Sequence, residues 1–529
     1  MKLLLALLSL TCGLQMDAQT RTWSWAWGAG SVGYEEAYVA VAPGGAVHVY
    51  GSFSNTLDAN GATLTSIGES DGFVQELDPD DGSVLWTAMA HHTGNVYVYD
   101  VAYRSTGELV VCGTVEHNGG TVQFGTHTLA GQQFGTQAFV AGVSATGQWS
   151  WVSGIAGAVS TSGFHVEVDA NDNVLLGCSY GTGLAVYRLT GQGQQSWQAV
   201  ATTTGSSVDL YGMDVLPSGD LVVTGRCYGT GTFGTHSVVV GGIYYDAFVA
   251  RLSAVGQWQW VAQAGGSHWD KGFAVCADAV GDVYVAGTFR NTADFGTTSL
   301  TATGSNNDGW LAKLDGNGQW LWAVQMGSVA YMEVYAMAMN ATGERLAITG
   351  SYAFNTPTIG GITLPAPPNA QNEIHVLEYS TAGEVLGALG AGGTGGDRGY
   401  AVAYNAVGAL FVAGVNGADM QLGAHALTGV GTPDLWVGRL DADLSTSVAM
   451  GTTEGQGTLY YDPAQQQIRF KGFEGSLWQV ELTDAVGKRL ATGSTSNTMA
   501  VPDALAAGLV LATLTRGEER RTMRIALLR

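Results

Sequence analysis

Residues that can bind a ligand gather in short segments that differ between otherwise similar stretches of the chain. They are the acids Glu35, Asp209, Asp270, Glu333 and Asp397, with His268, Trp269, Lys271 and Arg398 beside them. Gathered around one opening, such side chains can hold a cationic or polyol ligand, or Ca²⁺. The alternative is that the acids cap turns and keep the protein in solution. The segment 268–271 is the least repeated, so we treat it as the first candidate for mutation.

Other polar clusters favour structural roles. The turns 78–82 (Asp-Pro-Asp-Asp-Gly) and 169–173 (Asp-Ala-Asn-Asp-Asn) resemble part of a calcium loop, but neither is followed by the Glu that an EF-hand requires. We therefore predict hairpin turns there, with Ca²⁺ as the alternative and no other cofactor. His91 and His92 can bind a metal, but adjacent strand residues point to opposite faces, so at most one faces the opening.

Residues that recur at one position of a repeat are expected to be structural. His127, His236 and His425 share such a position, which predicts a surface strand and no metal site. Four further acids each recur two residues before an aromatic residue, and we expect their side chains to accept backbone N–H groups: Asp71, Asp246, Asp308 and Asp434. We find no Gly-x-Ser-x-Gly, His-Glu-x-x-His or P-loop motif, and we predict no catalytic residue.

The elements that position these residues repeat about every 62 residues. An apolar strand that ends at or near glycine recurs at Gly51, Gly113, Gly177, Gly225, Gly287, Gly350 and Gly414. Within a unit, as at 273–324, four short strands of period two are separated by turns and one longer loop with Phe-Gly-Thr. We therefore predict an all-β protein, a seven-bladed β-propeller of four-stranded antiparallel blades. The predicted repeats lie near residues 37–91, 96–157, 164–205, 210–266, 272–328, 334–393 and 399–451.

Tryptophan pairs mark the last strand of a unit, as in Trp149/Trp151, Trp258/Trp260 and Trp320/Trp322. Both members of a pair lie on one face, so we expect them to pack blade on blade. Residues 22–28 carry the same pattern ahead of the first full repeat. We expect this strand to pair with the last blade, close the ring and protect its edge. The third unit lacks the long loop, so its outer edge should be shorter.

Composition excludes several classes of protein. The 529 residues include 78 Gly and carry a net charge of −23. A basic nucleic-acid-binding protein, a coiled coil and collagen are all inconsistent with these values. Cys112, Cys178, Cys227 and Cys276 have no C-x-x-C spacing, so we predict buried free thiols, with a disulfide as the alternative.

Both ends of the chain differ from the repeats. Residues 1–18, with Lys2 before an apolar stretch at 3–10 and Ala18 at a cleavage point, are typical of a signal peptide. No later apolar stretch is long enough to predict a transmembrane segment. Residues 456–529 hold nine Lys and Arg against seven Asp and Glu. Their short strands predict a small C-terminal β-sandwich.

Two resemblances add to this interpretation. Residues 22–450 resemble the SBBP family of bacterial β-propeller repeats, on segments such as 281–289 and 308–314. Residues 456–529 resemble the C-terminal sorting domain of the type IX secretion system. That resemblance rests on Asp462 and Pro463, on Gly487 and Lys488, and on Gly508. Asp462 and Val510 depart from that family's Asn and Tyr.

The second resemblance implies a Bacteroidetes-type cell, the type IX machinery as partner, and a tail that is removed during release or surface attachment. A plain accessory β-domain is the alternative. We expect an exported or cell-surface binding or adhesion module for glycan or protein, which does not bind nucleic acid. The alternatives are a secreted polysaccharide-acting enzyme and a structural or gliding-associated surface protein.

Overall fold

The computed structural model describes most of the repeat region and the strands of the C-terminal part. Described are residues 21–442 except 31, 32, 34, 131–134, 156–162, 328, 329, 431 and 432, and then 458–462, 467–471, 478–483, 489–495, 498–500, 508–516 and 519–527. The predicted signal peptide and the Pro463, Gly487 and Lys488 positions lie outside these residues. The chain forms two compact units, Arg21–Asp441 and a C-terminal unit that begins at Ala442.

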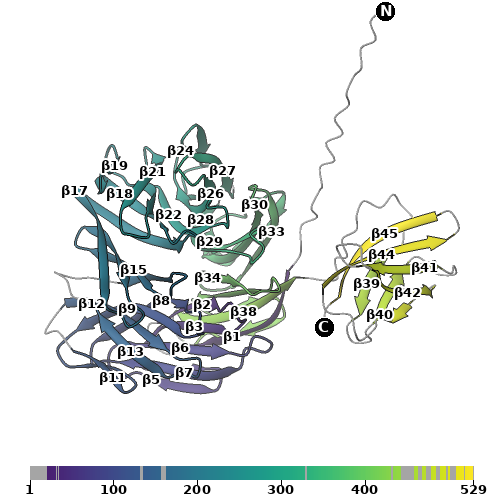
Figure 1. The fold of residues 1–529 in the computed structure, drawn as a ribbon, viewed down its shortest axis with the longest axis horizontal. Coiled ribbons are helices and arrows are strands. Elements are labelled where there is room, and N and C mark those ends of the chain that lie inside the picture. The colour runs from purple at the N-terminus through teal and green to yellow at the C-terminus, as the bar shows by residue number, and fades with distance from the viewer. Residues whose placement is uncertain are drawn as a thin grey trace, which may run out of the picture. The chain divides into compact units, whose positions relative to one another are not determined.

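The Arg21–Asp441 unit has a β-propeller-like all-β fold, in which short antiparallel sheets surround a common centre (Figure 1). Each predicted repeat contributes a sequence of four strands. In the first three repeats these are β2 (Glu35–Val41), β3 (Val47–Phe53), β6 (Asp71–Leu77) and β7 (Val84–His91); β8 (Asn95–Tyr103), β9 (Leu109–His117), β12 (Gly135–Val143) and β13 (Trp149–Gly154); and β14 (Gly163–Val168), β15 (Val174–Tyr180), β16 (Gly183–Leu189) and β17 (Gln195–Val215).

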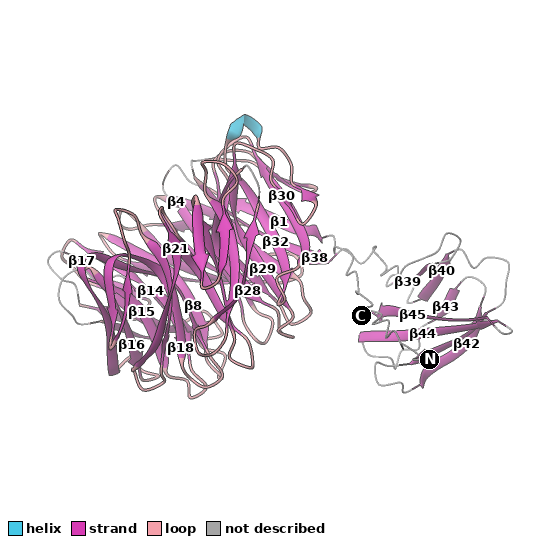
Figure 2. Cartoon of the chain, turned by 90° about the horizontal axis from the view of Figure 1, so that it is seen from above, coloured by secondary structure: helices cyan, strands magenta, loops and turns pink. Residues whose placement is uncertain are grey.

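The remaining repeats follow the same order. Their strands are β17, β18 (Leu221–Phe233), β20 (Asp246–Leu252) and β21 (Trp258–Gly266); β22 (Lys271–Ala277), β23 (Val283–Phe289), β26 (Asp308–Leu314) and β27 (Trp320–Met326); β28 (Tyr331–Met339), β29 (Arg345–Ala353), β32 (Glu373–Ser380) and β33 (Val385–Gly393); and β34 (Arg398–Tyr404), β35 (Leu410–Asn416), β38 (Asp434–Ala442) and β1 (Arg21–Ala29). The described residues contain one helical turn, η1 (Pro368–Ala370), which lies at the periphery (Figure 2).

The N-terminal strand joins the last repeat, as predicted, because β1 pairs with β38 in the sheet β1-β38-β35-β34. First strands also contact one another from each repeat to the next. The contacts run β2–β8, β8–β14, β14–β17, β17–β22, β22–β28, β28–β34 and β34–β2. One hydrophobic cluster contains Trp25, Val49 and Phe73 together with Phe411 and Val437, so the first and last repeats share a core.

The tryptophans of the last strands pack between repeats, as predicted. Six turn glycines each lie against a Trp of the preceding repeat, in the pairs Gly82–Trp25, Gly147–Trp86, Gly193–Trp151, Gly256–Trp197, Gly318–Trp260 and Gly383–Trp322. Indole N–H groups also bridge repeats, since Trp149 Nε1 donates to the Met89 carbonyl at 2.9 Å and Trp25 Nε1 to that of Pro79 at 3.0 Å. In the last repeat, Trp25 of β1 therefore takes the place that a tryptophan of the repeat's own last strand takes in the other repeats.

The loop expected between the second and third strands is a β-hairpin in most repeats, so that prediction was wrong. The hairpin strands are β4 (Thr56–Ala59) and β5 (Ala62–Thr65), β10 (Val122–Phe124) and β11 (His127–Leu129), the end of β18 with β19 (His236–Val239), β24 (Thr292–Phe295) and β25 (Thr298–Thr301), β30 (Thr358–Ile359) and β31 (Ile362–Thr363), and β36 (Met420–Leu422) and β37 (His425–Leu427). In the fifth repeat, Phe295 is buried edge-on against Trp320 with ring centroids 5.3 Å apart, and Gly296 supplies the turn at φ +61°. β24 also pairs with β21 of the preceding repeat and so covers its edge.

The third repeat lacks this hairpin, as expected, because only Gly181 and Thr182 join β15 to β16. Its predicted boundary with the fourth repeat, between residues 205 and 210, instead falls inside the 21-residue strand β17. β18 is long enough to pair with β17 on both sides of this boundary, from Ala201↔Phe233 to Val215↔Leu221. Pairing with β18 therefore keeps the backbone of β17 extended at residues 205–210, where a connection between two repeats was expected.

The four predicted free thiols, Cys112, Cys178, Cys227 and Cys276, are buried and form no disulfide with another described residue. In the C-terminal unit, the described strands form two antiparallel sheets. One contains β39 (Thr458–Asp462), β40 (Gln467–Lys471) and β43 (Thr498–Ala500); the other contains β42 (Arg489–Thr495), β41 (Trp478–Thr483), β44 (Gly508–Arg516) and β45 (Glu519–Leu527). No helix among the described residues is long and apolar enough to cross a membrane.

Candidate functional site

An aromatic residue stands at the same place in the first strand of every repeat, and we call this set the central belt. Its members are Tyr38, Tyr99, Phe164, Tyr211, Phe273, Tyr335 and Tyr400, and all are half-buried. Ring centroids link Tyr38 to Tyr400 at 6.0 Å, Tyr400 to Tyr335 at 5.2 Å, Tyr335 to Phe273 at 6.1 Å and Phe273 to Tyr211 at 5.2 Å. Tyr99 and Phe164 form a separate pair at 5.6 Å. Sequence reasoning missed the belt, although its spacing follows the repeat.

A β-bulge places six of these rings. The register between the first and second strands shifts at Tyr99, Phe164, Tyr211, Phe273, Tyr335 and Tyr400, each of which lacks a partner across the ladder. In five of these repeats the residue before the aromatic pairs with the repeat glycine, and in the third repeat the residue after it, His165, pairs with Gly177. A bulge re-aims a side chain and bends its strand. The same local geometry therefore recurs around the centre, once for each of these repeats.

In six repeats the second strand needs glycine because the backbone of the first strand comes very close to it, in the first repeat without a bulge. A Cβ on the repeat glycine would meet the carbonyl oxygen of the residue two positions before the aromatic. The separations are Gly51–Glu36 1.9 Å, Gly113–Tyr97 1.9 Å, Gly225–Asp209 1.8 Å, Gly287–Lys271 1.9 Å, Gly350–Glu333 2.0 Å and Gly414–Arg398 1.9 Å. Any other residue would force the two strands apart. The glycine that defines the repeat in the sequence thus permits the approach that positions the belt.

Most of the acids predicted to surround the opening are buried. Glu35 and Asp397 are 0% exposed and Asp270 is 1% exposed. Asp270 accepts hydrogen bonds from the Gly266 and Arg290 amides at 2.9 and 3.2 Å, and so joins β21 to the end of β23. Asp397 accepts one from the Gly417 amide at 3.1 Å. Burial raises the pKa of Asp270 to about 8 and that of Asp397 to about 6. These contacts favour the structural alternative for both acids.

The other two predicted acids also have protein partners. Glu333 is 8% exposed and accepts hydrogen bonds from Tyr331 Oη and from Asn307 Nδ2. Asp209 is half-buried and pairs with Arg226 Nε at 2.6 Å. Arg226 in turn lies over the rings of Tyr245 and Tyr211, at 4.4 and 5.6 Å from their centroids. Both acids stand two residues before a belt tyrosine, Asp209 before Tyr211 and Glu333 before Tyr335.

Three side chains of the segment 268–271, those of His268, Trp269 and Lys271, belong to a group of aromatic and cationic residues that we call the Trp269 cluster. Its residues are Tyr244, Tyr245, His268 and Trp269 with Arg226, Lys271 and Arg290. The His268 and Tyr244 rings stack at 4.2 Å, and Trp269, which is 38% exposed, meets His268 edge-on at 4.9 Å. Lys271 Nζ lies 5.4 Å from the Phe273 centroid, so this cluster continues into the central belt.

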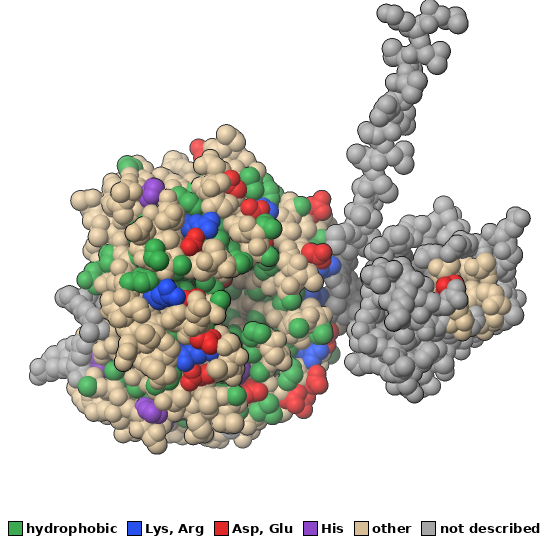
Figure 3. All heavy atoms as spheres, in the orientation of Figure 1, with side chains coloured by type: hydrophobic (Ala, Val, Ile, Leu, Met, Phe, Trp, Pro, Cys, Tyr) green, Lys and Arg blue, Asp and Glu red, His purple; other side chains and the backbone are tan. Residues whose placement is uncertain are grey.

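Arg398, the remaining candidate, is the first residue of β34 and is half-buried. Burial raises the pKa of Tyr400, and the charge of Arg398 partly opposes that rise. The face of this unit seen in Figure 3 is hollowed near its middle, with basic and acidic side chains around the hollow. Aromatic rings and charged groups together line the central region, as they do in sites that orient small ligands.

The recurrent acids bind backbone amides, as predicted. Asp71 accepts from the Ile67 and His92 amides, Asp308 from Thr303, and Asp434 from Val430. The carboxylate of Asp246 accepts from Gln263 Nε2, and it also has a bond from the Gly266 amide. In the turns proposed as alternatives for Ca²⁺, Asp78 and Asp169 accept from their own turn amides. No group of three or more metal-ligating side chains occurs within the described part of the chain.

The histidines contact protein groups. His91 Nδ1 lies 2.8 Å from Asp71, and His92 is buried against Gly119 and His117. His425 Nε2 lies 3.2 Å from the Trp23 carbonyl, while His127 and His236 are half-buried in hairpin strands. In the C-terminal unit, Asp462 ends β39 and Gly508 begins β44.

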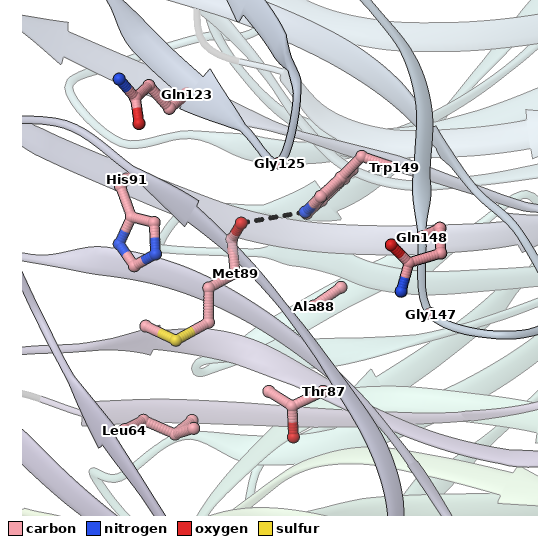
Figure 4. Close-up of a pocket in the computed structure, with 10 residues that line it drawn as sticks. All are labelled: Leu64, Thr87, Ala88, Met89, His91, Gln123, Gly125, Gly147, Gln148 and Trp149. Carbon is pink, nitrogen blue, oxygen red and sulfur yellow. Dashed lines mark hydrogen bonds between the residues drawn. The ribbon is translucent and has the colours of Figure 1, made fainter.

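A separate pocket of about 400 Å³ lies between the first two repeats (Figure 4). Its lining is Leu64, Thr87, Ala88, Met89, His91, Gln123, Gly125, Gly147, Gln148 and Trp149. The Trp149 indole and the Met89 carbonyl close one side through their hydrogen bond. This pocket belongs to the outer strands and is distinct from the belt.

No family model matches the chain, and no curated protein sequence matches it. Solved structures with remote likeness include a protein from Lactobacillus plantarum, with 14% identity, a TM-score of 0.40, and coverage of 70% of this chain and 95% of that one. A gluconolactonase from Xanthomonas campestris has 15% identity, a TM-score of 0.29, and coverage of 62% and 96%. Drosophila Plexin A has 8% identity, a TM-score of 0.38, and coverage of 80% and 88%. Likenesses this remote say nothing about activity.

Proposed function

We propose that this chain is an exported or cell-surface seven-bladed β-propeller that binds glycans at its central belt. Two observations support a closed ring of seven blades: β1 pairs with β38, and contacts between first strands run from β2 through each repeat to β34 and back to β2. Arg439 adds a further link, since its Nη1 donates to the Pro79 carbonyl at 2.7 Å. Arg188 and Arg251 make the same kind of bond to the next repeat, at Ala254 and Gly316.

The single observation that carries the proposed function is the belt itself, with one half-buried aromatic ring from each repeat at the centre. The weakly polar C–H face of a sugar packs against such rings, while its hydroxyl groups need hydrogen-bonding partners at the ring edge. Burial raises the pKa of Tyr211 and of Tyr335 to about 12, so both hydroxyl groups stay neutral and can donate.

The test is a glycan array probed with the full chain, followed by titration of the best ligand. Tyr335→Leu should weaken binding at least tenfold, about 1.4 kcal/mol, because this ring contacts both Phe273 and Tyr400. Tyr180→Leu, a half-buried tyrosine at the end of β15 and outside the belt, is the matched control and should bind normally. Binding of no glycan, or equal binding by Tyr335→Leu and the control, would overturn the proposal.

We further propose that residues 1–18 direct export and that residues 456–529 act as a type IX sorting tail. The supporting observations are the sequence segments described above. In a cell with an active type IX system, the full chain should reach the medium or the cell surface, and a chain ending at residue 455 should remain in the periplasm. Export of the shortened chain, or retention of the full chain, would contradict the sorting role.

A further inference from the structure

Three cations of the Arg21–Asp441 unit form no ion pair with a carboxylate among the residues that the structure describes. This unit holds eleven Lys and Arg residues. Eight of them lie within 4.0 Å of a carboxylate: Arg21, Arg104, Arg188, Arg226, Arg251, Lys313, Arg345 and Arg439. Lys271, Arg290 and Arg398 have no such ion pair with any described residue. In a chain with a net charge of −23, where acids outnumber bases, an unpaired cation is the exception.

The three unpaired cations lie at one end of the sheets. Lys271 and Arg398 begin the first strands β22 and β34, and Arg290 follows the end of the antiparallel second strand β23. Paired cations such as Lys313 and Arg251 lie toward the opposite end, near the third-strand termini. The three cations without an ion pair therefore lie at the end of the sheets where the first strands begin.

One of these cations lies over the exposed Trp269 ring, and a second lies over the neighbouring Tyr245 ring. Arg290 Cζ lies 5.4 Å from the Trp269 centroid. Lys271 Nζ lies 5.7 Å from the centroid of Tyr245, whose ring is 6.4 Å from that of Trp269. Arg226 adds its guanidinium over Tyr245, and only its Nε is hydrogen-bonded to a described group. Aromatic faces hold these cations in place without neutralising them, which leaves N–H donors for an incoming anion.

We infer that the Trp269 cluster binds a sugar residue that carries one carboxylate or sulfate group. The flat face of the sugar packs on Trp269, and the acidic group lies between Lys271 and Arg290. This inference rests on the proposed function and names the class of glycan. A single acidic group fits better than a polyanion, because nearby Asp209 and the overall negative charge repel a chain of many charges.

The experiment uses the full chain and pairs of oligosaccharides that differ only in one glucuronate, sialate or sulfate group. The acidic member of at least one pair should bind at least tenfold more tightly than its neutral parent. Raising the salt concentration from 50 to 500 mM should reduce this preference several-fold, because the charges are partly exposed. Comparison of the carboxylate and sulfate members identifies which acidic group is preferred.

Variants separate charge from stacking. Lys271→Met and Arg290→Gln should each reduce the acidic preference three- to tenfold, whereas Trp269→Ala should weaken binding of the acidic sugar and of its neutral parent alike. Lys313→Met is the matched control, because Lys313 also lies over a ring, that of Tyr284 at 4.9 Å, but at the opposite end of its sheet. Equal binding of neutral and acidic sugars overturns this inference and leaves the proposed function standing. Absence of any sugar binding overturns both.

Discussion

Replacing the repeat glycine Gly414 by alanine tests the link between the repeat and the central belt. The new Cβ would lie 1.9 Å from the Arg398 carbonyl oxygen, with only backbone atoms as its nearest neighbours. Real Cβ contacts are not shorter than 3.0 Å, so β34 and β35 must separate by roughly 1 Å. That movement breaks the ladder on both sides, at the pairs Arg398↔Val415 and Gly399↔Gly414.

The expected cost follows from these contacts. Two lost backbone hydrogen bonds contribute about 2 kcal/mol, and the strain of an overfilled site adds about 1–3 kcal/mol. Gly414→Ala should therefore destabilise the protein by about 3–5 kcal/mol and weaken glycan binding through displacement of Tyr400. Gly44→Ala is the control, because its Cβ would meet nothing within 4 Å, and it should change stability by less than about 0.5 kcal/mol.

Urea unfolding followed by tryptophan fluorescence provides the assay, with both variants measured beside the parent chain. A second measurement, titration with the best glycan from the array, reports on the position of Tyr400. Equal unfolding midpoints for Gly414→Ala and Gly44→Ala would refute the argument that carbonyl approach requires the glycine. If Gly414→Ala is destabilised but still binds the glycan normally, the close approach of β34 and β35 is not what positions Tyr400 for binding.

Three other changes test the architecture. Burial, reinforced by the charge of Asp397, raises the pKa of Glu373 from 4.5 to about 8. The stability that the protonated Glu373 contributes is therefore present below about pH 4.5 and is lost as the pH rises to 8. Glu373→Gln should reduce this pH dependence by on the order of 2 kcal/mol, as measured by unfolding at pH 5 and pH 9. Phe295→Ala removes a fully buried ring from the Trp320 contact and should cost about 3–5 kcal/mol in urea unfolding, whereas Leu321→Ala, which is 52% exposed, should cost far less. The four buried thiols should react with a thiol reagent only after denaturant is added, and fast reaction of the folded protein would contradict their burial.

The sequence predicted the strands because their period of two and their turn glycines are local signals. It also predicted the position of β1, since its Trp pattern matches other last strands. The hairpins were missed, because segments of two to four residues have too little periodicity to mark a strand. β17 was divided wrongly, since its continuity comes from pairing with β18, which lies outside the segment itself.

The acids show the limit of reasoning from residue type. Glu35, Asp270 and Asp397 are polar and lie in variable segments, features typical of a binding site, yet all three are buried. The carboxylates of Asp270 and Asp397 accept hydrogen bonds from backbone amides that lie elsewhere in the sequence, and that proximity depends on tertiary structure. The aromatic positions, in contrast, recur along the sequence but resemble ordinary strand residues until the bulge shows where they lie.

Pairing of β1 with β38 also has a kinetic consequence. The first described strand is made before every other strand of its unit, but its partner is made last, about 400 residues later. Joining ends so far apart costs about 5 kcal/mol in loop-closure entropy, and such non-local pairing slows folding. Until β38 is available, the indoles of β1 lack their partner strand. A chaperone that shields Trp23, Trp25 and Trp27 during this interval would therefore raise the yield of folded protein.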